Sequence, residues 1–382
     1  MIELAKKIGS LTHNLFPRRY FQRQVRTVEP VPAYFYHQID AAEFEQICKL
    51  IVEGGFQALT INQLLDRDFN PKAPALLLTM DDGWSSVWSI AFPIARRYGI
   101  RFTLFLVPEA IEDSPECRST LDDGADVAVL SQRDLGDRPM LTWAEVQALS
   151  QSGWVEIQSH SLNHGMVFTS ASPREFSTPT GSFPRTDRVP VISQIGDRDV
   201  AEWKPPLGTP VYTLAPALVA PQRFIENETA REHCIAIVRE NGGEQFFQTE
   251  GWRQLLQQTF DRAGETGHWE GEEERRDRYR QDLTQAKDQI ETRLSGVQIR
   301  AFAPPWGAMH PDLSAVAQQT GHELLVLADP LPQLGKQSKL PIYPRLKGNA
   351  IWILLQGPIL GTIAWLKANR RSKERIAKGA IP

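Results

Sequence analysis

The stretch Pro74–Trp84, PALLLTMDDGW, joins an uninterrupted apolar run to two adjacent carboxylates and a glycine. A run this apolar has no polar face, so it predicts a parallel strand that is covered on both sides. Asp81 and Asp82 then follow at the point where the strand opens into a loop, which is the edge that carries active sites in parallel α/β folds. Asp-Asp-Gly is also ordinary turn and capping chemistry, so this stretch alone leaves a structural role open.

The same succession of apolar strand, turn and helix continues on both sides of this stretch. Alternation of this kind indicates parallel strands joined by crossover helices, and hence an α/β sandwich or barrel. We expect strands at VPAYFY (31–36), FQALT (56–60), RFTLFLVP (101–108) and WVEIQSH (154–160), and helices at 41–55, 61–66, 87–99 and 142–153.

The alternation stops between Phe168 and about Trp269, where a segment rich in Pro, Ser, Thr and Gly leads into a more helical part. We interpret 168–269 as an insertion. A long charged helix (270–296) and two strands, in VQIRAFAPPWG and HELLVLADP, then resume the pattern. The expected organisation is an N-terminal extension (1–30), a (β/α) barrel (31–348) interrupted by the insertion 168–269, and a C-terminal apolar helix with a basic tail (349–382).

The composition is that of a folded globular chain, with 382 residues, 41% hydrophobic and 23% charged. A formal net charge of −4 argues against nucleic acid as a partner, because polyanion binding draws on a basic field. The three cysteines are widely spaced and odd in number, which argues against a disulfide framework and a thiolate metal site. The first twenty residues show no secretory signal, so we expect a cytoplasmic protein.

The segment 350–366, AIWILLQGPILGTIAWL, is the most apolar part of the chain. It is shorter than the about 20 apolar residues of a membrane-spanning helix, and a Gln-Gly-Pro sequence interrupts it. We therefore expect a buried terminal helix. The alternative is a membrane-peripheral helix, in which Trp352, Trp365 and the basic residues that follow contact headgroups through residues 350–375. The oligomeric state is left open.

A second polar cluster, His160-Ser-Leu-Asn-His164, directly follows the strand expected at 154–160. Imidazoles four residues apart share one face of a helical turn and can chelate a divalent cation. A carboxylate from another strand can complete a three-ligand site with one open position for water. A structural histidine pair is the alternative, and the missing Glu of HExxH removes the usual zinc-protease interpretation.

A third cluster, Ala303-Pro-Pro-Trp-Gly307, also ends a strand. Together with Thr79-Met-Asp-Asp-Gly-Trp84 and His160-Ser-Leu-Asn-His164, it resembles the first three motifs of the polysaccharide deacetylases, the NodB-homology family. The resemblance covers roughly residues 30–166 and 270–348. Its first two motifs are together specific, while the third is looser.

This resemblance implies a distorted (β/α) barrel of the NodB-homology type that removes N-acetyl groups from an amino sugar with one divalent metal, usually zinc. By position, Asp82, His160 and His164 are the expected ligands. Asp81 is the expected general base on the attacking water, and the backbone amide of Trp306 is expected to help to hold the oxyanion. A base held off the metal is what attack on an amide carbon requires.

The chain departs from the family pattern at two places. Family members often carry an Arg at the start of the third motif, where this chain has Ala303, and Arg345 is a candidate to approach from a later strand. The late motif that supplies the general acid histidine is absent, which leaves His310 as the best remaining candidate. Candidates for substrate contact are His37, Trp84 and Pro305.

We therefore predict a metal-dependent hydrolase that deacetylates an N-acetylhexosamine-containing polysaccharide or glycolipid. One alternative is a carbohydrate-binding relative that keeps the metal pocket without turnover. The absent acid motif favours this alternative, whereas Asp81 opposes it because binding alone has no use for an unligated base. A third interpretation is an amidase that acts on a small soluble amide.

Overall fold

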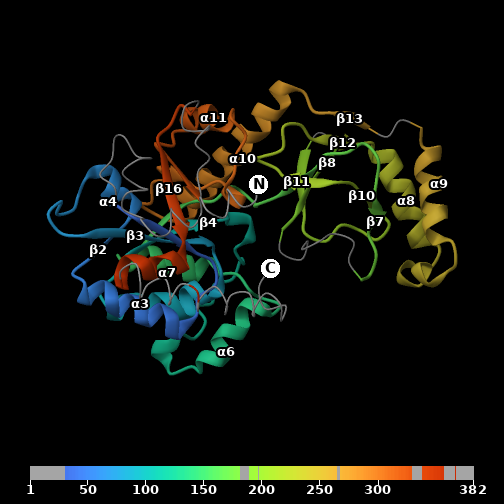
Figure 1. Cartoon of the computed structure of the whole chain (residues 1–382). Helices are drawn as coiled ribbons and strands as arrows, with labels where there is room; N and C mark the ends of the chain where they lie inside the picture. The colour runs from blue at the N-terminus through green and yellow to red at the C-terminus, as the bar shows by residue number, and fades with distance from the viewer. Residues whose placement is uncertain are drawn as a thin grey trace. The chain divides into compact units, whose positions relative to one another are not determined.

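The computed structural model describes residues 31–180, 189–196, 198–264, 267–328, 338–356 and 366. These residues form two compact units (Figure 1). The first consists of the described residues of Met1–Leu162 and Leu283–Pro382, and the second of those of Asn163–Asp282. The expected N-terminal extension, 1–30, lies outside the described residues.

A closed ring of seven strands forms the first unit, and every pairing in it is parallel. A short additional strand, β2 (Gln57–Leu59), also pairs with β3. The prediction of a (β/α) barrel is therefore confirmed. In order round the ring the strands are β1 (Ala33–Tyr36), β3 (Ala75–Asp82), β4 (Phe102–Leu106), β5 (Val155–Ser159), β14 (Ala301–Phe302), β15 (Leu324–Ala328) and β16 (Ile342–Lys347).

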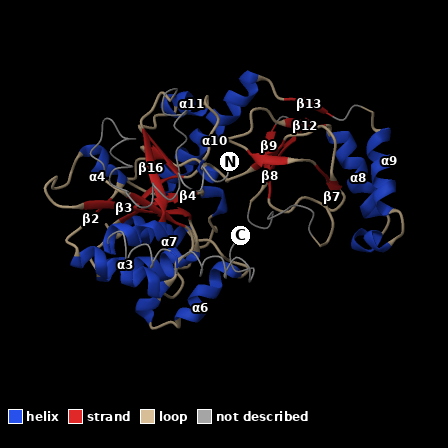
Figure 2. Cartoon of the chain, in the orientation of Figure 1, coloured by secondary structure: helices blue, strands red, loops and turns tan. Residues whose placement is uncertain are grey.

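Helices cover the outer face of this ring (Figure 2). Local sequence explains where several of them begin, since Thr60 and Thr142 each form a capping box with the Gln or Glu three residues later. Gly99, the last residue of the helix predicted at 87–99, is in the left-handed region with φ of 67° and lies just beyond the last helical residue, Arg97. The helices are α3 (Ala41–Glu53), α4 (Ile61–Asp66), a π-helical turn (Val87–Ala91) that continues as α5 (Phe92–Arg97), α6 (Val127–Gln132), α7 (Trp143–Gln151), α10 (Glu272–Arg293) and α11 (Leu313–Gln319).

The second unit has a sheet and a core of its own. Its four-stranded sheet has the order β11-β6-β8-β9, with β6 and β8 in the interior. Aromatic and aliphatic side chains such as Phe168, Tyr212 and Phe260 fill the core. The elements are β6 (Met166–Phe168), β7 (Glu175–Phe176), β8 (Val191–Ile195), β9 (Arg198–Glu202), β10 (Pro210–Val211), β11 (Leu214–Pro216), β12 (Phe224–Glu226), α8 (Glu228–Glu240), α9 (Trp252–Arg262) and β13 (Gly267–Trp269).

The bounds of the second unit, Asn163–Asp282, include the whole of the predicted insertion 168–269 and extend beyond both of its ends. At the start, β6 follows His164 after a single intervening residue. At the other end, Arg278 donates to Glu270 and to the carbonyl oxygen of Ala217. The contact between Arg278 and Ala217 joins residues far apart in the sequence. The change in composition that marked the insertion therefore could not show that the unit extends to Asp282.

Only the beginning of the expected C-terminal helix is described. Residues 351–356 are helical, and Ile351, Trp352 and Ile353 are buried in the barrel unit. The Trp352 indole donates a 3.1 Å hydrogen bond to Glu43 on α3. Residues 357–365 and 367–382, which carry Trp365 and the basic tail, lie outside the described residues. Among the helices that the structure describes, none combines the length and apolarity needed to cross a membrane.

Candidate metal centre

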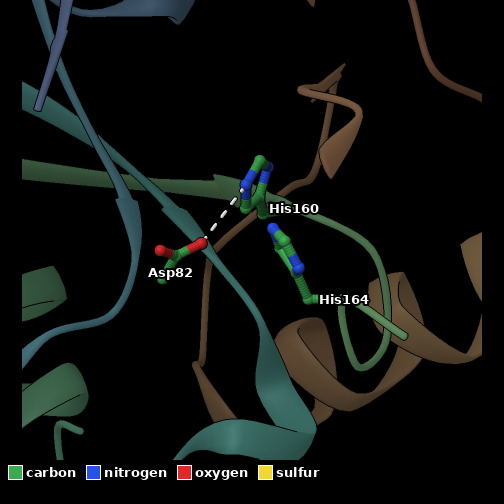
Figure 3. A group of neighbouring side chains, drawn as sticks. All are labelled: Asp82, His160 and His164. Carbon is green, nitrogen blue, oxygen red and sulfur yellow. Dashed lines mark ion pairs between the residues drawn. The ribbon is translucent and has the colours of Figure 1, made fainter. Parts of the chain in front are cut away.

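The three predicted ligands lie close together, beside the carboxyl ends of β3 and β5. Asp82 ends β3, His160 directly follows β5, and His164 comes four residues later (Figure 3). One donor atom of each lies within 4.8 Å of the other two. His160 Nε2 is 3.4 Å from Asp82 Oδ1, and both side chains are largely shielded from solvent. Two imidazoles and one carboxylate suit Zn²⁺, and three protein ligands leave a coordination position open.

The backbone of the third motif orients His160. Its Nδ1 lies 2.6 Å from the carbonyl oxygen of Ala303, which can only accept a hydrogen bond. The proton is therefore assigned to Nδ1 in the neutral ring, which leaves Nε2, 3.4 Å from Asp82 Oδ1, as the nitrogen that can bind a metal. A histidine ligand typically has this arrangement, in which a hydrogen bond at the second nitrogen sets the tautomer and the ring orientation.

The charges around His160 favour a cation at this position. Burial by itself lowers the pKa of His160, but the negative charges of Asp81 and Asp82, together with the hydrogen bond to Asp82, outweigh burial and raise that pKa above its usual value. The same carboxylates stabilise a divalent cation that takes the place of the proton. The electrostatics therefore agree with the donor set.

Unusual backbone conformations cluster in the three motifs. Among the described non-glycine residues with positive φ, four belong to a motif: Asp82 (72°), Ser161 (72°), His164 (58°) and Trp306 (64°). Such conformations are costly and persist only when the surrounding structure holds them, and they concentrate at functional sites. Asp82 is the last residue of β3, and its positive φ interrupts the extended backbone there. The alternation of side chains between the two faces of the strand therefore does not continue through Asp82.

Asp81, the second carboxylate, is held by Arg345. Arg345 Nη1 and Nη2 donate to the two Asp81 oxygens at 2.6 and 2.7 Å, and both side chains are buried. Nη1 also contacts Thr79 Oγ1 at 3.0 Å, and the guanidinium lies over the rings of Phe35 and Phe105. A buried carboxylate is tolerated because a buried guanidinium compensates its charge. Arg345 thus contacts Asp81 from β16, as the sequence suggested that it could.

Two further sequence candidates lie beside Asp82. The Trp84 indole donates to Asp82 Oδ2 at 3.0 Å, and Trp84 is itself only 6% exposed. His37, after β1, has its Nε2 3.9 Å from the same oxygen and remains 45% exposed. His37 is therefore accessible next to the site, whereas the contact of Trp84 is one that orients Asp82.

The remaining candidates lie in and after the third motif. Trp306 is 44% exposed, and its neighbour Pro305 is buried. His310 precedes α11, where its Nδ1 accepts a hydrogen bond from Asp312 N–H at 3.3 Å and lies 3.9 Å from an Asp312 oxygen. The role of His310 as general acid stays a prediction.

Sequence reasoning missed several residues that hold the first motif in place. Asp134 Oδ1 accepts hydrogen bonds from Ser85 Oγ at 2.7 Å and from Ser86 N–H at 3.0 Å. The backbone of the same segment pairs with the turn after Asp82, through Leu141 N–H to the Gly83 carbonyl oxygen at 2.8 Å. The contact of Thr79 with the same arginine as Asp81 could have been anticipated, because residues two apart on a strand lie on the same face. Asp134 had no such signal in the sequence.

Fold and side chains together define an α/β barrel protein with a candidate hydrolytic metal centre at the carboxyl ends of its strands. Residues 69–209 match the polysaccharide deacetylase family. This match confirms the resemblance to the NodB-homology proteins that the motifs show. The third motif, at 303–307, lies outside the matched residues.

The sequence identity to an individual relative is low. The chain is 25% identical over 153 residues to the Bacillus subtilis protein YxkH, whose name assigns it to the polysaccharide deacetylases. The match covers 37% of this chain and 46% of YxkH, so it spans less than half of that relative.

Three solved structures are also similar to this chain. One is a de-N-acetylase from Aggregatibacter actinomycetemcomitans, with a TM-score of 0.45, 16% identity, and coverage of 83% of this chain and 93% of that chain. The second is the BpsB deacetylase domain from Bordetella bronchiseptica, with a TM-score of 0.46, 17% identity, and coverage of 83% of this chain and 95% of that chain. The third is IcaB from Ammonifex degensii, with a TM-score of 0.43, 14% identity, and coverage of 84% of this chain and 96% of that chain.

Proposed function

We propose that this protein is a metal-dependent hydrolase that removes N-acetyl groups from an N-acetylhexosamine-containing polysaccharide or glycolipid. The observation that carries the proposal is that two adjacent carboxylates have different partners. Asp82 lies with His160 and His164 in a donor set, whereas Asp81 is paired with Arg345. The match of residues 69–209 to the polysaccharide deacetylase family supports an acetylated glycan as the substrate class.

Asp82, His160 and His164 would hold the metal, which supplies Lewis-acid polarisation of the acetamide carbonyl when it is bound. Asp81 accepts a proton from the attacking water. Both Asp81 oxygens accept from Arg345, but a carboxylate has about four lone-pair positions, so acceptor capacity remains. Arg345 also fixes the orientation of the Asp81 carboxylate through these two hydrogen bonds.

The products follow from the balance of the reaction. Water adds its oxygen to the acetamide carbon, the carbon–nitrogen bond breaks, and the sugar nitrogen leaves as an amine after it gains a proton. The backbone N–H of Trp306 is assigned to the developing oxyanion. His310 is the candidate donor of the proton to the leaving nitrogen, and His37 is the candidate for contact with the substrate.

Release of acetate from a panel of N-acetylated substrates tests this proposal. The panel combines chitin oligosaccharides, poly-N-acetylglucosamine and small acetamides, and zinc content is measured on the same preparations. We expect acetate from glycans and loss of zinc in both His160→Ala and His164→Ala, with His268→Ala, a histidine on the exposed end of β13, as the matched control. Zinc-loaded protein that releases no acetate favours the carbohydrate-binding alternative, and release only from small acetamides favours the amidase.

A further inference from the structure

The chain passes directly from a proposed metal ligand into the interior of a sheet. The second unit begins at Asn163, one residue before His164, and β6 begins at Met166, two residues after it. β6 pairs with β11 on one edge and with β8 on the other. A strand paired on both edges cannot shift without breaking its ladder, so the backbone that follows His164 is held by the inserted unit.

Hydrogen bonds hold the residues on both sides of His164. Asn163 is buried, and its Oδ1 accepts from Gly165 N–H at 3.1 Å. The carbonyl oxygen of Gly165 accepts from Ala217 N–H, and Met166 N–H donates to the carbonyl oxygen of Pro190, each at 2.9 Å. Gly165 and Met166, which follow the ligand, are therefore held by hydrogen bonds within the second unit, and Asn163, which precedes it, is joined to Gly165.

Gly165 is also held by close packing. A Cβ added at this position would lie 2.6 Å from both Cγ1 and Cδ1 of Ile192, on β8, and 2.8 Å from Asn163 Oδ1. The φ of Gly165 lies outside the left-handed region, so an alanine here would conflict with these side-chain atoms, which would have to shift, and not with its own backbone preference. The Ile192 side chain thus packs closely against Gly165, the residue that follows the ligand His164.

We propose that Asn163 and Gly165 are positioning residues for His164, and that Ile192 and Ala217, which hold Gly165, sustain the metal affinity of the site. This inference rests on the metal site of the proposed function. His164 has a φ of 58°, a conformation that persists only when neighbouring structure enforces it. Metal ligands must also be placed within about 0.5 Å of their productive positions, which a loop without support does not achieve.

The test is zinc affinity, measured by competition with a chromophoric chelator on the full-length protein. Gly165→Ala should raise the dissociation constant roughly ten- to hundredfold, the loss typical when the support of a ligand is removed. Ile192→Ala added to Gly165→Ala removes the atoms that clash and should recover a large part of that loss. Recovery is partial because Asn163 Oδ1 remains close to the new methyl group. Ordinary destabilisation predicts instead that the second substitution makes the first one worse.

Val238→Ala is the matched control, because it opens the core of the same second unit at a residue remote in sequence from His164. We expect it to lower the melting temperature without changing zinc affinity. Wild-type affinity in Gly165→Ala, or an equal loss of affinity in Val238→Ala, would overturn the positioning role. A wild-type protein that binds no zinc contradicts the proposed function itself, so the two failures are distinguishable.

Discussion

Arg345, on the last strand of the barrel, holds both oxygens of the Asp81 carboxylate across a sequence separation of 264 residues. The family resemblance places a bracing arginine in the third motif, where this chain has Ala303. Because β16 pairs with β1 and β1 pairs with β3, the ring brings Arg345 to the residue that the missing side chain would have contacted. Ala303 still contributes to the site through its carbonyl oxygen, which orients His160.

Arg345→Met should destabilise the protein by about 3–5 kcal/mol, because it leaves the buried Asp81 charge without its partner. The free energy of unfolding in urea measures this effect. Adding Asp81→Asn to Arg345→Met should restore part of the loss. As a control, Arg97→Met, which removes an exposed pair with Glu45, should change stability by less than about 1 kcal/mol. Equal effects of the two arginine substitutions contradict the prediction.

Asp82→Asn and Asp81→Asn should separate metal binding from turnover. The first removes a ligand charge, so zinc content and activity should fall together. The second should leave zinc content near that of the wild type and lower kcat by roughly 10² to 10⁴, the usual contribution of a general base. Zinc content by elemental analysis and acetate release on the same samples provide the comparison. Wild-type rates in both variants would exclude Asp81 as the base.

Trp352→Ala should lower stability by about 3–5 kcal/mol, because it removes a large buried side chain and its hydrogen bond to Glu43. Removal of residues 350–382 should destabilise the barrel by at least as much. Melting temperature and liposome flotation are measured together. Flotation of the wild type that is lost on truncation, with no change in melting temperature, favours the membrane-peripheral alternative.

His322 should make stability depend on pH. Burial, helped by the nearby positive charge of Lys287, lowers its pKa from 6.5 to about 4 in the folded chain. As pH falls below about 6.5, the unfolded chain therefore binds a proton that the folded chain does not bind until about pH 4. This difference should remove up to about 3 kcal/mol of stability across that interval and none above it. Urea unfolding of wild type and His322→Gln at several pH values should show a steeper loss in the wild type, and parallel curves contradict the assignment.

The sequence predicted a parallel α/β fold and the three motifs, and the resemblance of those motifs to a known family implied the barrel. An apolar strand that ends in Asp81 and Asp82, and another that ends in His160, predict both the parallel strands and the edge where these side chains meet, because all carboxyl ends lie on one side of a parallel sheet. The spacing of His160 and His164 is likewise local. These features depend on residues that are close along the chain, where periodicity and turn chemistry act directly.

Only the tertiary structure decided what supports that site. Closure of the ring sets Arg345 against Asp81, and the pairing of β14 with β5 brings the Ala303 carbonyl oxygen to His160. The packing of Ile192 against Gly165 depends on the pairing of β6 with β8, two strands that residues 169–190 separate in the sequence. These are contacts between residues far apart in sequence, some of them made by backbone atoms, which every residue type carries. No local pattern encodes them, since they exist only after the strands have paired.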